Sequence, residues 1–138
     1  MDYPEILIGL LSGGAIVAVV QHFLDKKKEA EIQLNRIKEE KYRSLLIFMT
    51  CSMDFEKRKY FSLSEQVEMS NSEDYLNKIK EYFYHNVLFA SDEVILAIKG
   101  FIHSPDQENF VKTAKAMRRD LWGTKTKLTM QDLLVDSK

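Results

Sequence analysis

The sequence predicts an all-α protein, in which an N-terminal transmembrane helix continues into a stalk and a small up-and-down helical bundle. One observation is the apolar stretch Ile6–Val20, which contains no charged residue. A second is that neither glycine nor proline occurs between Gly14 and Gly100, which favours long helices. A third is that alternating strand patterns are weak and no Asn-Gly or Asp-Gly hairpin turn is present.

These patterns divide the chain into three parts. We expect an N-terminal transmembrane anchor over residues 1–24, a charged helical stalk over residues 25–44, and a cytoplasmic helical bundle over residues 45–138. Short connections between its helices predict an up-and-down order for the bundle.

The anchor has the length that a bilayer requires. As a helix, Tyr3–Leu24 would measure about 33 Å, close to the ~30 Å of a hydrocarbon core. Its N-terminal flank is acidic, whereas a cleaved signal peptide would begin with basic residues. A buried core helix of a soluble protein is the other alternative. Three lysines follow the anchor and favour the cytoplasmic side of the inner cell membrane, with the N-terminus outside. The expected contacts with lipid headgroups are made by Lys26, Lys27 and Lys28.

Two glycines in the anchor are candidates for self-association. Gly9 and Gly13 are four residues apart, and small residues at this spacing let two helices approach closely in lipid. The same spacing also arises in spans that merely tolerate glycine.

The stalk is highly charged from Asp25 to Tyr42, with Leu34 and Ile37 as sparse apolar positions. This pattern is typical of a solvated helix or of one strand of a short coiled coil. From Leu45 onward apolar residues recur at helical spacing, so this part should enter the core.

Local signals mark the ends of the remaining helices. We predict N-terminal caps at Ser72, Ser91 and Ser104. Pro105 then suits the first helical position, Gln107 would complete a capping box, and Gly123 suits a C-terminal cap.

Three segments of the bundle carry distinctive motifs: Phe89–Ile95, which contains Ala-Ser-Asp-Glu-Val, Ala116–Leu121, which reads Ala-Met-Arg-Arg-Asp-Leu, and Lys127–Thr129. In their order and spacing they resemble a family of small prokaryotic single-span membrane proteins with a cytoplasmic helical domain. Arg119 stands where lysine is expected, and Trp122 replaces a smaller residue. The resemblance implies the same fold and topology. It implies no activity, and therefore no site residues.

Catalytic, metal and cofactor motifs are missing from the sequence, so we predict a protein that is not an enzyme and holds no cofactor. The three histidines, His22, His85 and His103, form no metal-ligand motif. Cys51 is the one cysteine and lies in an apolar helical stretch, where a small buried side chain is the expected role. The net charge of −1 gives no basic field for nucleic acid, and no small-molecule substrate is evident.

The polar cluster around Arg118, Arg119 and Asp120 is the most suggestive surface feature. Consecutive helical residues point about 100° apart, so the three cannot serve one ligand. One interpretation of this cluster is that one arginine pairs with Asp92 or Glu93. The other is that a partner docks through Arg118, Arg119 and Trp122. For Trp122 the interpretation that we favour from the sequence is a position in the core.

We therefore expect a membrane-tethered helical module for protein interaction or scaffolding, with a protein partner or a homo-oligomer. The alternative is a membrane-acting effector, such as a toxin or defence component, that oligomerises through its span.

Overall fold

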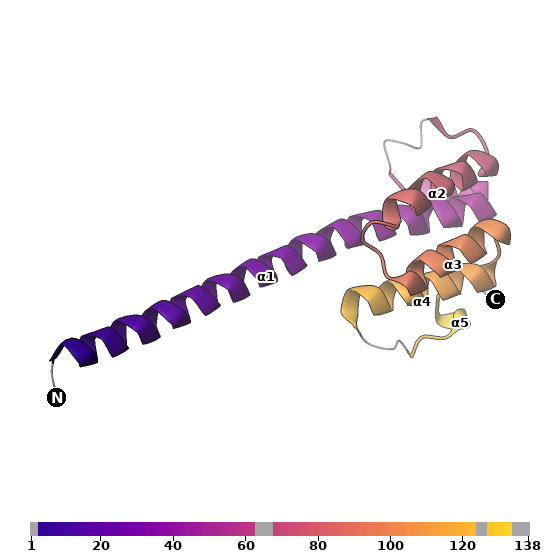
Figure 1. The fold of residues 1–138 in the computed structure, drawn as a ribbon. Coiled ribbons are helices and arrows are strands. Elements are labelled where there is room, and N and C mark those ends of the chain that lie inside the picture. The colour runs from indigo at the N-terminus through magenta and orange to yellow at the C-terminus, as the bar shows by residue number, and fades with distance from the viewer. Residues whose placement is uncertain (1–2, 63–67, 124–126, 134–138) are drawn as a thin grey trace. The chain divides into compact units, whose positions relative to one another are not determined.

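The computed structural model describes the backbone of residues 3–62, 68–123 and 127–133, and the side chains of these residues except 3–12 and 130. Every regular element in these ranges is helical, which confirms the all-α class. Figure 1 shows their order: α1 (Tyr3–Met53), η1 (Phe55–Tyr60), α2 (Ser72–Asn86), α3 (Asp92–His103), α4 (Gln107–Trp122) and α5 (Met130–Leu133).

The chain forms two compact units, Met1–Arg36 and Ile37–Lys138. In the first unit, every described side chain from Gly13 onward is exposed. Among the residues with described side chains, no helix is both long and apolar enough to cross a membrane. Residues 3–12, which include Gly9 and the first part of the predicted span, lie outside those described side chains.

The second unit is a bundle of four main helices, as predicted. The last part of α1, then α2, α3 and α4 run in alternating directions, with short connections from α2 onward (Figure 1). Lys38 and Tyr42 are buried in it, although both lie within residues 25–44, the predicted stalk. The bundle therefore begins at Ile37, about two helical turns before the predicted boundary.

Aromatic side chains join α1 to α2 in the core. The Phe48 ring packs edge-on against Tyr82 with ring centroids 5.2 Å apart, and the ring centroid of Tyr75 lies 6.1 Å from that of Phe48. Such pairs add about 0.5–1.5 kcal/mol to the effect of burial. Cys51 is fully buried beside them, as predicted. Burial raises the pKa of its thiol, which keeps the sulfur protonated and unreactive.

Of the four predicted helix caps, Ser91 and Gly123 are confirmed, whereas the caps predicted at Ser72 and Ser104 are displaced. The Ser91 hydroxyl accepts from the Val94 N–H, and Gly123 ends α4 with φ of 67° in the left-handed region. The cap predicted at Ser72 is wrong, because α2 already begins there and the Asn71 side chain accepts from the Asp74 N–H at 2.9 Å.

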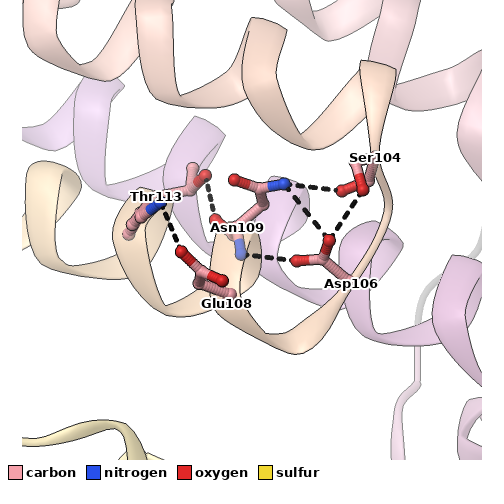
Figure 2. Close-up of polar contacts among 6 residues, drawn as sticks. Ser104, Asp106, Glu108, Asn109 and Thr113 are labelled. Carbon is pink, nitrogen blue, oxygen red and sulfur yellow. Dashed lines mark hydrogen bonds and ion pairs between the residues drawn. The ribbon is translucent and has the colours of Figure 1, made fainter.

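The turn between α3 and α4 also differs from the prediction (Figure 2). Ser104 ends α3, and Asp106 is the N-terminal cap of α4, accepting from the Asn109 N–H at 2.8 Å. The Ser104 hydroxyl donates to the other Asp106 oxygen at 2.7 Å. The predicted cap at Ser104 and first helical position at Pro105 are therefore wrong. A carboxylate two residues later accepts the free N–H groups more strongly than a hydroxyl does.

This cap predicts an acid-dependent loss of stability. The N–H of Asn109 and the hydroxyl of Ser104 lower the pKa of Asp106, so its ionised form is stabilised by folding. Its contribution is present above the ordinary carboxyl pKa of about 4, and is lost as the pH falls towards the lower folded-state value. In urea unfolding of the full chain, Asp106→Ala should be less stable than Asp106→Asn, which keeps an acceptor oxygen. Between about pH 7 and about pH 3, Asp106→Asn should lose less stability than the unchanged chain. Equal losses would contradict this role.

Candidate functional site

The last turn of α4 directs four neighbouring side chains to three different places. Asp120 points towards α1, and Arg119 pairs with Glu93 at the start of α3. Arg118 and Trp122, which are four residues apart and share a helix face, are exposed. Of the predicted candidates, Arg118 and Trp122 therefore face solvent and Arg119 pairs with Glu93, and docking of a partner on the three residues stays a prediction.

Asp120 is the centre of a buried polar network with two residues of α1. The Lys38 ammonium lies 3.1 Å from Asp120 Oδ1 and 3.0 Å from Oδ2. The Tyr42 hydroxyl donates to Oδ2 through a short hydrogen bond. The side chains of Lys38 and Asp120 are 11 % and 9 % exposed, so solvent screens this ion pair little.

The Tyr42 hydroxyl acts only as a donor in this network. Burial raises its pKa far above the ordinary value, and the hydrogen bond to Asp120 and the negative charge of that carboxylate raise it further. A phenol that stays neutral, beside a carboxylate already paired with an ammonium, offers neither a general base nor a nucleophile. The network therefore joins α1 to α4 and has no evident catalytic role.

The sequence predicted that one arginine of α4 pairs with Asp92 or Glu93, and the ion pair between Arg119 and Glu93 confirms this. Both side chains are more than one-third exposed, so the pair adds little to stability. Its effect is geometric, because it connects the end of α4 to the start of α3.

Trp122 is 72 % exposed, so the interpretation that it fills the core is wrong. Leu121 is the partly buried neighbour that packs against the core. One position later on the helix, the indole points into solvent, and Gly123 then turns the chain away.

Most of the large exposed apolar side chains of the bundle belong to segments at the end where α1 enters. The end of α2, the start of α3 and the end of α4 meet there (Figure 1). We call this set the apolar end; its members are Ile37, Tyr84, Val87, Leu88, Leu96 and Trp122. In the described part of the second unit, the one other large exposed apolar side chain is Tyr60. It lies in η1, which follows the C-terminal end of α1.

Sequence reasoning missed the apolar end. The apolar spacing along α2 would place Val87 on the buried face of that helix, whereas this side chain is 54 % exposed because the helix ends at Asn86. Leu88, in the connection to α3, is 87 % exposed. Their apolar character was visible, but their exposure depends on where α2 stops.

The described side chains contain no candidate metal site. No group of three or more His, Cys, Asp or Glu residues there lies close enough together to hold an ion. Lys26, Lys27 and Lys28 are all exposed on α1.

Comparison of the chain with protein-family models, with curated proteins and with solved structures gives no match. The resemblance to small prokaryotic single-span membrane proteins therefore stays a prediction.

The buried network predicts an asymmetry between single and double substitutions. Asp120→Leu leaves the Lys38 ammonium buried without a counter-charge, which should lower the free energy of unfolding by about 3–5 kcal/mol. The double variant Lys38→Met, Asp120→Leu removes both charges and should recover most of that loss. Urea unfolding followed by circular dichroism measures both. A double variant as unstable as Asp120→Leu alone would show that the ion pair does not couple α1 to α4.

Proposed function

We propose that the chain is a membrane-tethered helical module that docks a protein partner on the apolar end of its bundle. The single observation that carries this proposal is the exposure of large apolar side chains in the segments that meet at that end, with Trp122 at 72 % exposure.

The composition of the apolar end suits a protein interface. Several large apolar side chains exposed at one end of a small domain are typical of an interaction surface. Tryptophan and arginine are the residues most enriched among those that dominate binding energy. Trp122 and Arg118 are both exposed on one face of α4, so the indole can anchor a partner while the guanidinium binds a carboxylate at the rim.

The tether is supported by the sequence of α1. Ile6–Val20 carries no charge, and Lys26, Lys27 and Lys28 follow as the expected headgroup contacts. Ile16, Val17 and Phe23 are more than half exposed in the first unit, so no part of the described chain covers them. The proposed location is the inner cell membrane, with the N-terminus outside and the bundle in the cytoplasm.

A second candidate is a membrane-acting effector that oligomerises through the span. Its support is that an added Cβ at Gly13 or Gly14 would meet no atom within 4 Å. Packing within the described chain therefore gives no reason for glycine there, whereas close approach of another helix would.

The docking surface predicts which substitutions release the partner. The full chain is expressed in its native cells, the membranes are washed with alkaline carbonate, and neighbouring proteins are crosslinked and identified by mass spectrometry. Trp122→Ala and Leu88→Ser should each reduce the yield of one reproducible partner by about tenfold or more. The matched control Tyr60→Ala removes an exposed aromatic side chain from the other end and should leave the yield unchanged.

Thermal unfolding distinguishes a lost contact from misfolding. Because exposed side chains contribute little to the core, all three variants should unfold at nearly the same temperature as the unchanged chain. Release of the chain by the carbonate wash would contradict the tether. Equal losses in Tyr60→Ala and Trp122→Ala, or no partner at all, would contradict the docking surface.

A further inference from the structure

Apolar and small residues, interrupted by the single charged residue Lys27, follow one another along the first unit at a heptad spacing. The intervals alternate between three and four residues, which keeps these positions on one side of a pair of supercoiled helices. We call this set the seam; its members are Gly13, Ile16, Val20, Phe23, Lys27, Ala30 and Leu34. In heptad notation Gly13, Val20, Lys27 and Leu34 take position a, and the other three take position d.

The large side chains of the seam are exposed in the first unit. Ile16 is 63 %, Val20 51 % and Phe23 68 % exposed. Leu34, among the charged residues that follow, is still 39 % exposed. A helix whose apolar face repeats with this period buries it best against another helix of the same period.

The charged residues beside the seam indicate that the other helix is a second copy of α1, parallel and in register. Lys26 takes position g and Glu31 takes position e of the next heptad. In a parallel, in-register pair of identical helices, g of one chain faces e of the following heptad in the other. Lys26 of each copy then meets Glu31 of the partner subunit, and twofold symmetry produces this pair of opposite charges twice.

Lys27 fits the same arrangement. A single polar residue at position a lowers the stability of a coiled coil but fixes its register and its number of strands. The methylene stem of lysine can lie along the apolar seam while its ammonium reaches water. Gly13 and Ala30 are small, and the absence of any atom within 4 Å of a Cβ at Gly13 leaves room for a close approach there.

From the seam and its flanking charges we infer that α1 forms a parallel, in-register, two-stranded coiled coil with a second copy of this chain. This deepens the proposed function and rests on it only in taking α1 as the tether of the module. It requires no occupant at the apolar end of the bundle. The seam spacing also reaches back to Gly9, so the predicted self-association of Gly9 and Gly13 would continue along the helix beyond the span.

Disulfide trapping tests the facing residues directly. In the purified full chain carrying Cys51→Ala, Ala30→Cys places one thiol on the seam. Ile32→Cys is the matched control, since Ile32 is 57 % exposed on the same helix but lies at position f, away from the seam. Two seam thiols of a parallel pair fall within the Cα separation of about 4.4–6.8 Å that a disulfide needs. Under a mild oxidant, Ala30→Cys should form at least about tenfold more covalent dimer than Ile32→Cys. Equal yields, or none, would overturn the inference.

Charge exchange tests the direction and register. Lys26→Glu places like charges opposite each other, and should raise the dissociation constant of the dimer in detergent by roughly three- to tenfold over its two symmetric sites. Adding Glu31→Lys should restore it. Arg36→Glu makes the same charge change at position c, away from the seam, and should leave the constant unchanged. Failure of the second substitution to restore dimerisation would exclude the parallel, in-register pair.

The two proposals fail separately. Trapping through Ala30→Cys in a chain that captures no protein at Trp122 would remove the docking proposal and leave the coiled coil. If the capture of a partner depends on Trp122 while the chain stays monomeric at every concentration, the coiled coil is excluded and the docking proposal remains.

Discussion

The buried contact of Lys38 and Tyr42 with Asp120 fixes how α1 and α4 meet, and the surface of the bundle follows from that arrangement. This contact joins the first helix of the bundle to the fourth, across 82 residues of sequence. The aromatic pair of Phe48 and Tyr82 joins α1 to α2. A buried ion pair adds little net stability compared with apolar residues of the same size, because both charges lose their hydration. Its effect is on specificity, since the carboxylate is satisfied only when α1 and α4 meet at one register.

The orientation of Asp120 then decides what α4 presents to solvent. With this carboxylate turned towards α1, the helical rotation of about 100° per residue carries Arg119 towards Glu93 and leaves Arg118 and Trp122 outside. The exposed indole is therefore a consequence of the buried network. The apolar end owes the rest of its composition to the points at which α1 enters and α2 ends, which expose Ile37, Val87 and Leu88.

Local signals made much of the fold predictable. Ser91 caps α3 and Gly123 ends α4 as expected, because each depends on a few adjacent residues. The cap at Asp106 was mispredicted because Ser104 is also a good cap, and the choice between them depends on hydrogen bonds formed only in the folded turn. The exposure of Trp122 was mispredicted because it follows from a contact between residues distant in the sequence, Lys38 and Asp120. The Arg119–Glu93 pair was predictable from opposite charges at helix ends that a short connection brings together.

Native-state hydrogen exchange of the full chain tests the role of the buried network most directly. If Lys38, Tyr42 and Asp120 hold α1 and α4 in one cooperative unit, the backbone amides around Tyr42 and around Asp120 should exchange only through global unfolding, with the same free energy of opening. A final turn of α4 that opens at a much lower free energy, while α1 stays protected, would contradict this account.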